Sequence, residues 1–553
     1  MNLALLKGDI TMSNLTRRNF LKSSLGASGA LLLSSAAFAG EKEKKGKNKK
    51  SGNDPVNALE EIDDLINELE KKGRRFKTDQ LDADNDTEWN RLVEYYFDRD
   101  DYSCLSVNSA NLCPSMKPVS KMVDLVQDML KKDISFPMRG ELAEASLSRG
   151  LDSIKNWLGL GKQEYEADYL MALVANSTQG NNFINNGLMS SKFFNPEKDN
   201  VVVWDVNHPT NYQAWEYRKA TQGWSDDSIR ILRTKMFSNS VTPQELKNGV
   251  LPSDPKSEDD IIKALKQTVD KNTKIVTLSW QSNECGMLLP MERIVHELRA
   301  INKDMHIHAD SAQTFGVLDL KLGDLDVDSI TGSFHKWPCG PKMVGLLYMN
   351  NKSNAAERFI PSEWGYDEHI KTPEDYGFMA KDGVIDPNAK RFSYLGQQND
   401  ATLVATWMTA LFHTGKLHPN VTPAKIEKRI HYLGTKTKEA LFKNLPKIYP
   451  DFNEKEAYKW ITTPTTDDNL RSSVFLFKCP QGVQAGNVIK NVYEKHQLAI
   501  ANLKVLGHDL IRISPTFCNT ASDITQVVEG TIDVIYNMQK GKLANNTIYR
   551  SYA

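Results

Sequence analysis

Two reactive side chains, Asp310 and Lys336, each lie at the end of a short apolar run. Residues 305–309 (MHIHA) lead into Asp310, and residues 329–334 (SITGSF) end one residue before the pair His-Lys that contains Lys336. A third apolar run follows at 344–349. Short runs of this kind, separated by turns and a crossover, predict a mostly parallel α/β sheet. In such sheets ligands bind beyond the carboxyl ends of the strands, where Asp310 and Lys336 would both lie.

A lysine beside a carboxylate at neighbouring strand ends has a well-known chemical use. Pyridoxal 5'-phosphate (PLP) forms a Schiff base with a lysine, and an aspartate often keeps its ring nitrogen protonated. The protonated ring then accepts electrons when a bond at the substrate α-carbon breaks. For an arbitrary Asp and Lys, a salt bridge or two solvated charges would be the commoner explanation. The neighbouring residues decide between the two explanations.

Those neighbours resemble the cofactor segment of the class V aminotransferase superfamily, which includes cysteine desulfurases and isopenicillin N epimerase-like proteins. The matching pieces are residues 308–313 (HADSAQ), Gly316, residues 333–336 (SFHK) and residues 340–342 (GPK). The resemblance implies PLP-transferase fold type I. This fold has a large domain with a mostly parallel, doubly wound sheet and a smaller α+β C-terminal domain. It also implies a homodimer.

The resemblance assigns the covalent chemistry to Lys336 and the pairing with the pyridinium nitrogen to Asp310. Lys342 competes with Lys336 for the covalent role, but it follows a Gly-Pro turn beyond the strand, so Lys336 is expected. His208 follows the apolar run 201–204, where the family has a histidine whose ring stacks on the cofactor. A histidine after a strand more often only caps a turn, so the resemblance decides this assignment.

A further set of side chains would hold the cofactor without a covalent bond. They are Ser177, Thr178, Gln179, Asn283, Gln313, Ser333, His335 and Gln397. The first three follow a predicted strand at 169–174 and begin a helix, whose free N–H groups and dipole favour a phosphate. By resemblance, Gln313 bonds the ring 3-hydroxyl, while Ser333 and His335 hold the phosphate. Gln397 stands where the family has a residue that reaches the partner subunit's phosphate, although the Gly-Gln pair departs from the family's Gly-Thr.

Arg512 is the candidate substrate ligand. It lies in residues 510–515 (LIRISP), followed by Asn519 and Thr520, and this pattern resembles the family motif that binds the substrate α-carboxylate. A planar guanidinium binds a carboxylate through two parallel hydrogen bonds. A lone arginine in a strand is more often a surface ion-pair partner, so here too the following motif favours function.

The N-terminal residues predict export. Residues 16–22 (TRRNFLK) match a twin-arginine motif, and a weakly apolar stretch leads to an A-x-A site at residues 37–39. We expect a twin-arginine (Tat) signal peptide over residues 1–39, cleaved after Ala39, and a periplasmic mature protein delivered by the twin-arginine translocation machinery. Residues 40–56 are rich in lysine and nearly free of apolar side chains, which predicts a disordered linker.

Composition bounds the remaining possibilities. Lys and Arg number 69 against 70 Asp and Glu, so no overall basic excess points to nucleic acid. No apolar run is long enough for a membrane span, and the six cysteines have no metal-binding spacing, although one disulfide stays open. We expect an N-terminal helical segment (57–140), a large PLP-binding domain (141–395) and a small C-terminal domain (396–545).

Three functions remain after these observations. A cysteine desulfurase needs a nucleophilic cysteine on a mobile loop shortly before the substrate arginine, and residues 501–509 contain none. Transamination or epimerisation at the α-carbon of an amino-acid-like substrate is therefore expected first, and a β-lyase second. The third hypothesis is a degenerate, non-catalytic PLP-fold binding protein. The joint presence of Lys336, Asp310, His208 and Arg512 argues against it.

Overall fold

The fold is taken from a computed structural model. It describes residues 57–76, 78, 80–160, 169–190, 193–350, 358, 363, 396–465 and 467–545. The expected signal peptide (residues 1–39) and the lysine-rich linker (residues 40–56) lie outside this part of the chain. Within it, no helix is both long and apolar enough to cross a membrane.

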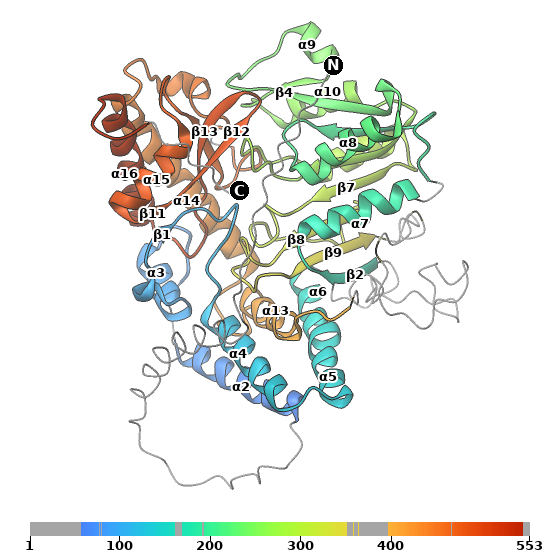
Figure 1. The fold of residues 1–553 in the computed structure, drawn as a ribbon, viewed down its shortest axis with the longest axis vertical. Coiled ribbons are helices and arrows are strands. Elements are labelled where there is room, and N and C mark those ends of the chain that lie inside the picture. The colour runs from blue at the N-terminus through green and yellow to red at the C-terminus, as the bar shows by residue number, and fades with distance from the viewer. Residues whose placement is uncertain are drawn as a thin grey trace, which may run out of the picture. The chain divides into compact units, whose positions relative to one another are not determined.

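An eight-stranded sheet lies at the centre of the larger part of the structure (Figure 1). In spatial order its strands are β2 (Tyr169–Val174), β9 (Gly345–Asn350), β8 (Ser329–Ser333), β7 (His306–Asp310), β6 (Thr273–Ser279), β3 (Asn200–Trp204), β4 (Ile229–Lys235) and β5 (Val250–Pro252). All neighbours run parallel except at β9, which is antiparallel to both β2 and β8. The predicted α/β fold with a mostly parallel sheet is confirmed.

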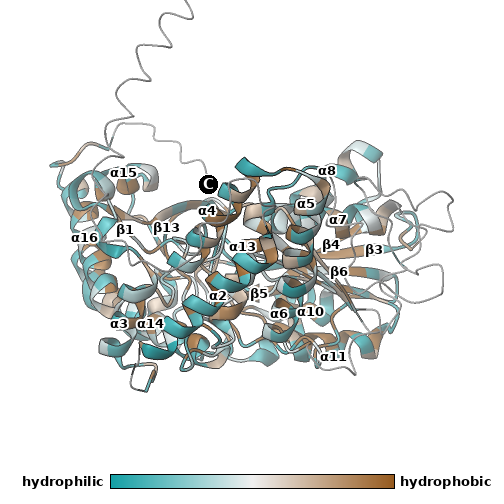
Figure 2. Ribbon diagram, turned by 90° about the horizontal axis from the view of Figure 1, so that it is seen from below, coloured by the Kyte–Doolittle hydropathy of each residue, from teal (hydrophilic) through white to brown (hydrophobic). Residues whose placement is uncertain are grey.

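Helices cover both faces of this sheet, as Figure 2 shows. Helices α7 (Ser177–Ser190) and α8 (Gln213–Gln222) lie on one face, and α10 (Glu258–Thr268) and α11 (Met291–Ile301) on the other. In α11 the buried residues are Met291, Ile294, Val295 and Leu298. Their spacing places one apolar stripe on the sheet. Because helices cover both faces, β2, β3, β7, β8 and β9 are buried along their whole length, and β7 and β8 are buried although they carry polar residues among the apolar ones.

The helices before the sheet pack against a helix that follows it. The early helices are α2 (Ala58–Arg75), α3 (Asp86–Tyr96), α4 (Lys117–Lys132), α5 (Phe136–Ala143) and α6 (Leu151–Trp157), with a π-helical segment at Glu144–Gly150. Helix α13 (Asp400–His413) packs against α4, α6 and the π-helical segment. Nearly every residue of α13 is buried, as expected for a helix that is apolar on all sides.

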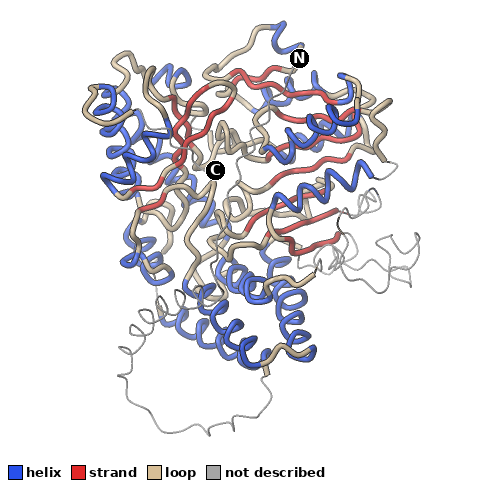
Figure 3. Tube along the Cα trace, in the orientation of Figure 1, coloured by secondary structure: helices blue, strands red, loops and turns tan. Residues whose placement is uncertain are grey.

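The C-terminal part has a separate sheet and core (Figure 3). Its antiparallel strands, in spatial order, are β10 (Phe475–Lys478), β13 (His508–Ile513) and β12 (Ala501–Val505). Helices α14 (Pro423–Asn444), α15 (Ala485–His496) and α16 (Ala521–Gln539) pack with this sheet. The N-terminal strand β1 (Leu105–Ser106) pairs with β11 (Leu498–Ala499), which brings the segment after residue 106 next to β13. The domain bounds drawn from the sequence stay a prediction.

Short elements complete the chain. They are α9 (Pro243–Lys247) and the 3₁₀ segments Arg99–Asp101, Pro209–Asn211, Asp226–Ser228, Leu445–Lys447 and Glu454–Lys459.

Candidate active site

The carboxyl ends of four parallel strands meet at one edge of the large sheet. Asp310 is the last residue of β7, and Lys336 follows the end of β8 by three residues. The loop after β3 carries His208, and the loop after β6 carries Asn283. Gly316 helps to bring these loops together. It has a positive φ of 83°, and a Cβ there would lie 2.7 Å from the Pro338 nitrogen, just beyond Lys336.

Lys336 is half-buried, and its ammonium has no hydrogen-bond or ion-pair partner among the described residues. Burial lowers the pKa of this ammonium to about 8, and Arg512 lowers it further, while Asp310 opposes the shift. A lysine with this pKa exchanges its proton near neutral pH and can act as a nucleophile. Lys342, in contrast, is exposed.

The Asp310 carboxylate is buried and held by three N–H donors. Its Oδ2 accepts from Asn181 Nδ2 at 2.9 Å and from Asn211 Nδ2 at 3.0 Å. Its Oδ1 accepts from the Ala312 backbone N–H at 2.9 Å. Donors of this kind stabilise the charged form of a carboxylate and fix its direction.

His208 lies in the same electrostatic environment. Burial lowers the pKa of its imidazole, Asp310 opposes the shift, and Lys336 and Arg512 add to it. Its Nδ1 accepts from the Thr210 backbone N–H at 3.4 Å, so this nitrogen carries no proton. The structure therefore brings the neutral His208 imidazole close to Lys336, Asp310 and Arg512.

Arg512 enters the site from strand β13 of the smaller sheet. It is 4% exposed, and its terminal nitrogens donate to the Asn283 carbonyl at 3.3 Å and to Asn108 Oδ1 at 3.2 Å. Its Nε is buried without a hydrogen-bond partner in the described part of the chain. Burial lowers the pKa of the guanidinium to about 10, and Glu284 opposes this shift. No described carboxylate forms an ion pair with this cation, so an anionic ligand group would complete its contacts.

The turn that begins α7 is joined to the end of β8. The Ser177 N–H donates to Ser333 Oγ at 3.0 Å, and the two hydroxyls are 2.7 Å apart. The Gln179 Oε1 accepts from the Ala175 N–H at 2.7 Å, and Thr178 is exposed. A Cβ at Gly345 would lie 2.6 Å from the Asn176 carbonyl carbon, so only glycine lets β9 start against this turn.

Three other predicted ligands have different surroundings. Gln313 is held by protein groups, since its Nε2 donates to the Ala110 carbonyl at 3.0 Å and its Oε1 accepts from Trp337 Nε1 at 2.8 Å. One amide hydrogen of Gln313 is left for a ligand. His335 is neutral, because burial and nearby Lys336 lower its pKa to about 4. Gln397 is exposed. Its expected contact is with a partner subunit, so that assignment stays a prediction.

The chain is similar to known proteins over part of its length. The class V aminotransferase family model matches residues 225–381. An isopenicillin N epimerase from Amycolatopsis lactamdurans is 23% identical over 275 residues, covering 49% of this chain and 63% of that protein. A cysteine desulfurase from Rattus norvegicus is 21% identical over 230 residues, covering 42% and 43%. The matched region is thus less than two thirds of either relative.

Solved structures extend the similarity at the level of the fold. A C-DES mutant with glycine covalently linked to its PLP cofactor aligns with a TM-score of 0.59 and 14% identity, covering 78% of this chain and 96% of that one. A cysteine desulfurase from Escherichia coli aligns with a TM-score of 0.58 and 15% identity, covering 81% and 98%.

Over about half of its length, the chain is therefore similar to proteins of the class V aminotransferase superfamily. The family match contains Asp310, Lys336 and the other predicted ligands from Asn283 to His335, whereas Ser177, His208 and Arg512 lie outside it.

PLP fits the side chains present at this edge of the sheet. A half-buried lysine without a partner, an anchored carboxylate and the amino end of a 14-residue helix lie at one edge of the sheet. The buried His335 Nδ1 has no hydrogen-bond partner within the described structure and is available to a ligand. The family match, the fold neighbours and this donor set together support PLP.

Several site residues received no role from the sequence. Asn181 and Asn211 hold Asp310, and Asn108 contacts Arg512. Glu284 lies close enough to Arg512 to raise the pKa of its guanidinium. Burial, together with Asp205, raises the pKa of the Glu284 carboxyl to about 7. Asparagine and glutamate are common on protein surfaces, so these residue types alone carry no signal for a site.

Proposed function

We propose that this chain is a PLP-dependent enzyme acting at the α-carbon of an amino-acid substrate, by transamination or epimerisation. The observation that carries the proposal is the Lys336 amine. It is half-buried, has no partner in the described structure, has a pKa of about 8, and shares one site with Asp310 and Arg512. A structural lysine would be expected either to pair with a carboxylate or to reach solvent.

The site residues supply the positioning and the proton transfers. When bound, the cofactor supplies an electron sink for the bond that breaks at the α-carbon. Asp310, fixed by its three N–H donors, is suited to hold a proton on the ring nitrogen. Lys336 removes and returns the α-proton as general base and acid. Arg512 binds the α-carboxylate through two parallel hydrogen bonds, which orients the α-hydrogen. His208 supplies a neutral ring for stacking.

A β-lyase is the second candidate, because the fold neighbours include a cystine C–S lyase. A desulfurase mechanism has less support. Strands β12 and β13 are joined by a tight turn at Leu506 and Gly507, and this stretch carries no cysteine. Cys113 lies close enough to raise the pKa of Lys336, but it is 5% exposed and its N–H is bonded to the His335 carbonyl at 2.9 Å. It is therefore not on a mobile loop.

The covalent assignment is tested by reduction and mapping. Full-length protein incubated with PLP should gain a visible absorption band, and borohydride should fix the cofactor to a single peptide that contains Lys336. Lys336→Ala should lose both signals, while Lys342→Ala, which removes the exposed neighbouring lysine, should keep them. A wild-type protein that stays colourless with PLP would favour the non-catalytic binding protein.

The reaction is assigned by following two products from candidate amino acids in D₂O. Solvent deuterium entering the α-position without keto-acid release would identify epimerisation. Keto acid accompanied by amine transfer to the cofactor would identify transamination, and keto acid with ammonia would identify elimination.

The export and assembly parts of the proposal rest on sequence. We propose delivery to the periplasm by the twin-arginine pathway and a homodimer in solution. Replacing both Arg17 and Arg18 by Lys should retain the protein in the cytoplasmic fraction, and light scattering of the purified protein should give twice the chain mass. A double variant found in the periplasm would contradict the export proposal. A monomeric mass would contradict the homodimer.

A further inference from the structure

The side-chain amide of Asn181, on α7, contacts the Asp310 carboxylate directly and the His208 ring by way of Thr210. The side chain is 1% exposed. Its Nδ2 donates to Asp310 Oδ2 at 2.9 Å and to Thr210 Oγ1 at 2.9 Å. Thr210 Oγ1 lies 3.0 Å from Nδ1 of His208. A single –NH₂ group therefore connects Asp310 to His208.

The orientation of this amide is fixed by two donors on its oxygen. Asn181 Oδ1 accepts from Thr331 Oγ1 at 2.5 Å and lies 3.0 Å from His308 Nε2. Both of these residues are fully buried strand residues, at 0% exposure. A flipped amide would point its oxygen at the Asp310 carboxylate and its hydrogens at the His308 N–H, which is unfavourable at both ends. All four hydrogen-bonding positions of the amide are thus used.

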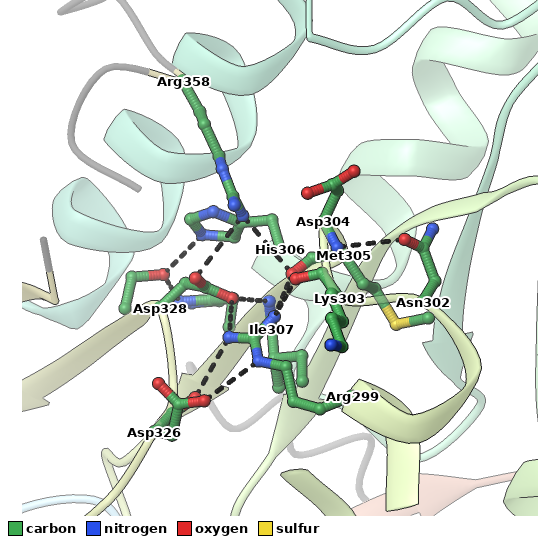
Figure 4. Close-up of polar contacts among 12 residues, drawn as sticks. Arg299, Asn302, Lys303, Asp304, Met305, His306, Ile307, Asp326, Asp328 and Arg358 are labelled. Carbon is green, nitrogen blue, oxygen red and sulfur yellow. Dashed lines mark hydrogen bonds and ion pairs between the residues drawn. The ribbon is translucent and has the colours of Figure 1, made fainter. Parts of the chain in front are cut away.

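The donor role of His308 is itself determined by its neighbours. Burial lowers the pKa of His308 to about 4, so the ring is neutral and carries one proton. Its Nδ1 lies 2.8 Å from Ser329 Oγ, and Ser329 Oγ lies 2.9 Å from His306 Nε2. Because Asn181 Oδ1 can only accept, the proton of His308 is on Nε2, which faces Asn181, and Nδ1 accepts from Ser329 Oγ. Figure 4 shows His306 at the far end of this chain, beside Asp328 and Arg358.

We propose that Asn181 is a positioning residue that holds the Asp310 carboxylate and the His208 ring in one fixed arrangement around the cofactor ring. The inference rests on the proposed function, because it assigns a purpose to the two groups that would contact the cofactor. Asn181 touches neither substrate nor reacting atoms. It acts through Asp310 by hydrogen bonding, and through His208 by way of Thr210.

Asn181→Leu removes the amide with little change in shape. In full-length protein loaded with PLP labelled with ¹⁵N in the ring, the ¹⁵N shift reports protonation of the ring nitrogen. Without Asn181 the Asp310 carboxylate is no longer held in position against the ring nitrogen, so the pH midpoint of that protonation should fall by about one unit, the size of one hydrogen bond to a charged group. The induced circular dichroism of the bound cofactor should also fall, because the His208 arm is released.

Two isosteric variants separate the two arms and cover the case in which Asn181→Leu does not fold. Thr210→Val cuts only the His208 arm, so the circular dichroism should fall while the ¹⁵N midpoint stays at the wild-type value. Thr331→Val leaves Asn181 in place with one donor fewer on its oxygen, and should shift the midpoint in the same direction by a smaller amount.

Asn302→Leu is the matched control at the opposite edge of the sheet. Asn302 donates to the Thr273 carbonyl at 3.0 Å and accepts from the Asp304 N–H at 3.0 Å, the latter drawn in Figure 4. Its loss removes one part-buried and one exposed hydrogen bond of a side-chain amide without touching Asp310, so both signals should stay at wild-type values.

The outcomes separate this inference from the proposed function. A wild-type chain that binds no PLP would overturn both. The role of Asn181 alone would be overturned if the wild type has a protonated ring nitrogen but the pH midpoint is unchanged in both Asn181→Leu and Thr331→Val. Equal shifts in Asn302→Leu would show a general loss of stability and would also overturn it.

Discussion

At the amino ends of β7 and β8 the charged side chains are paired with one another, whereas at the carboxyl ends of the same strands two cations have no paired carboxylate among the described residues. Figure 4 shows the paired end. Arg299 donates to Asp328 Oδ2 at 2.8 Å and to Asp326 at 3.2 Å, and Arg358 lies 3.4 Å from Asp328 Oδ1. Asp328 also accepts from the Ile307 N–H at 2.6 Å, which ties the charge cluster to β7.

The comparison distinguishes charge that stabilises a fold from charge that awaits a ligand. The cations of the carboxyl edge, Lys336 and Arg512, are desolvated without an ion-pair partner in the described structure. Desolvation without pairing costs free energy, so such groups persist where a ligand repays it. Four variants or measurements test this distinction.

Lys336→Ala should have the largest effect on activity and little effect on stability. Removing a general base and covalent ligand should lower the turnover rate about a thousandfold. The melting temperature of the cofactor-free protein should not fall, because the ammonium has no partner to lose in the part of the chain that the structure describes. A marked drop in that melting temperature would show that Lys336 is structural.

Asp328→Ala should give the opposite pattern. Removing this buried carboxylate leaves Arg299 with the exposed Asp326 as its remaining carboxylate partner in the described structure and takes the acceptor from the Ile307 N–H, at a cost of about 3–5 kcal/mol in the free energy of unfolding. Turnover per folded molecule should be unchanged. The control is Asp326→Ala, since this partner of Arg299 is 54% exposed and should cost less than about 1 kcal/mol. Equal denaturant midpoints for the two variants would break the comparison.

Arg512→Lys should weaken substrate use selectively. Lysine keeps the charge but cannot form two parallel hydrogen bonds, so kcat/KM should fall roughly tenfold to a hundredfold, mainly through KM. An amine without the α-carboxylate should react equally slowly with the wild type and the variant. If Arg512→Lys prefers the amino acid to the carboxylate-free amine as strongly as the wild type does, Arg512 is not the carboxylate ligand.

The pH dependence of cofactor capture should show the smallest effect. Only the neutral amine attacks, and burial lowers the pKa of Lys336 to about 8. The capture rate of cofactor-free protein should therefore rise tenfold per pH unit below about 8 and level off above it. Stopped-flow absorbance checks this. A rate that keeps rising to about pH 10 would indicate an ordinary solvated lysine.

Local patterns predicted much of the sheet but not all of it. The apolar run 169–174 coincides with β2, and the run at 329–334 ends one residue beyond β8. Strand β4 was not predicted, because its buried and exposed residues do not alternate regularly and it carries Arg230, Arg233 and Lys235. A strand near the sheet edge keeps charged side chains that a central strand excludes, so its sequence lacks the apolar run.

The sequence by itself determined the chemical types at the site: a lysine and an aspartate at strand ends, a small-residue turn before α7, and an arginine in a late strand. Tertiary structure alone decided which groups act on them. Asn181 and Asn211 reach Asp310 from 129 and 99 residues away, and Asn108 reaches Arg512 across 404 residues. The pKa of Lys336 likewise depends on burial and on those distant charges. Periodicity describes only neighbours along the chain, whereas hydrogen bonds and desolvation depend on neighbours in space.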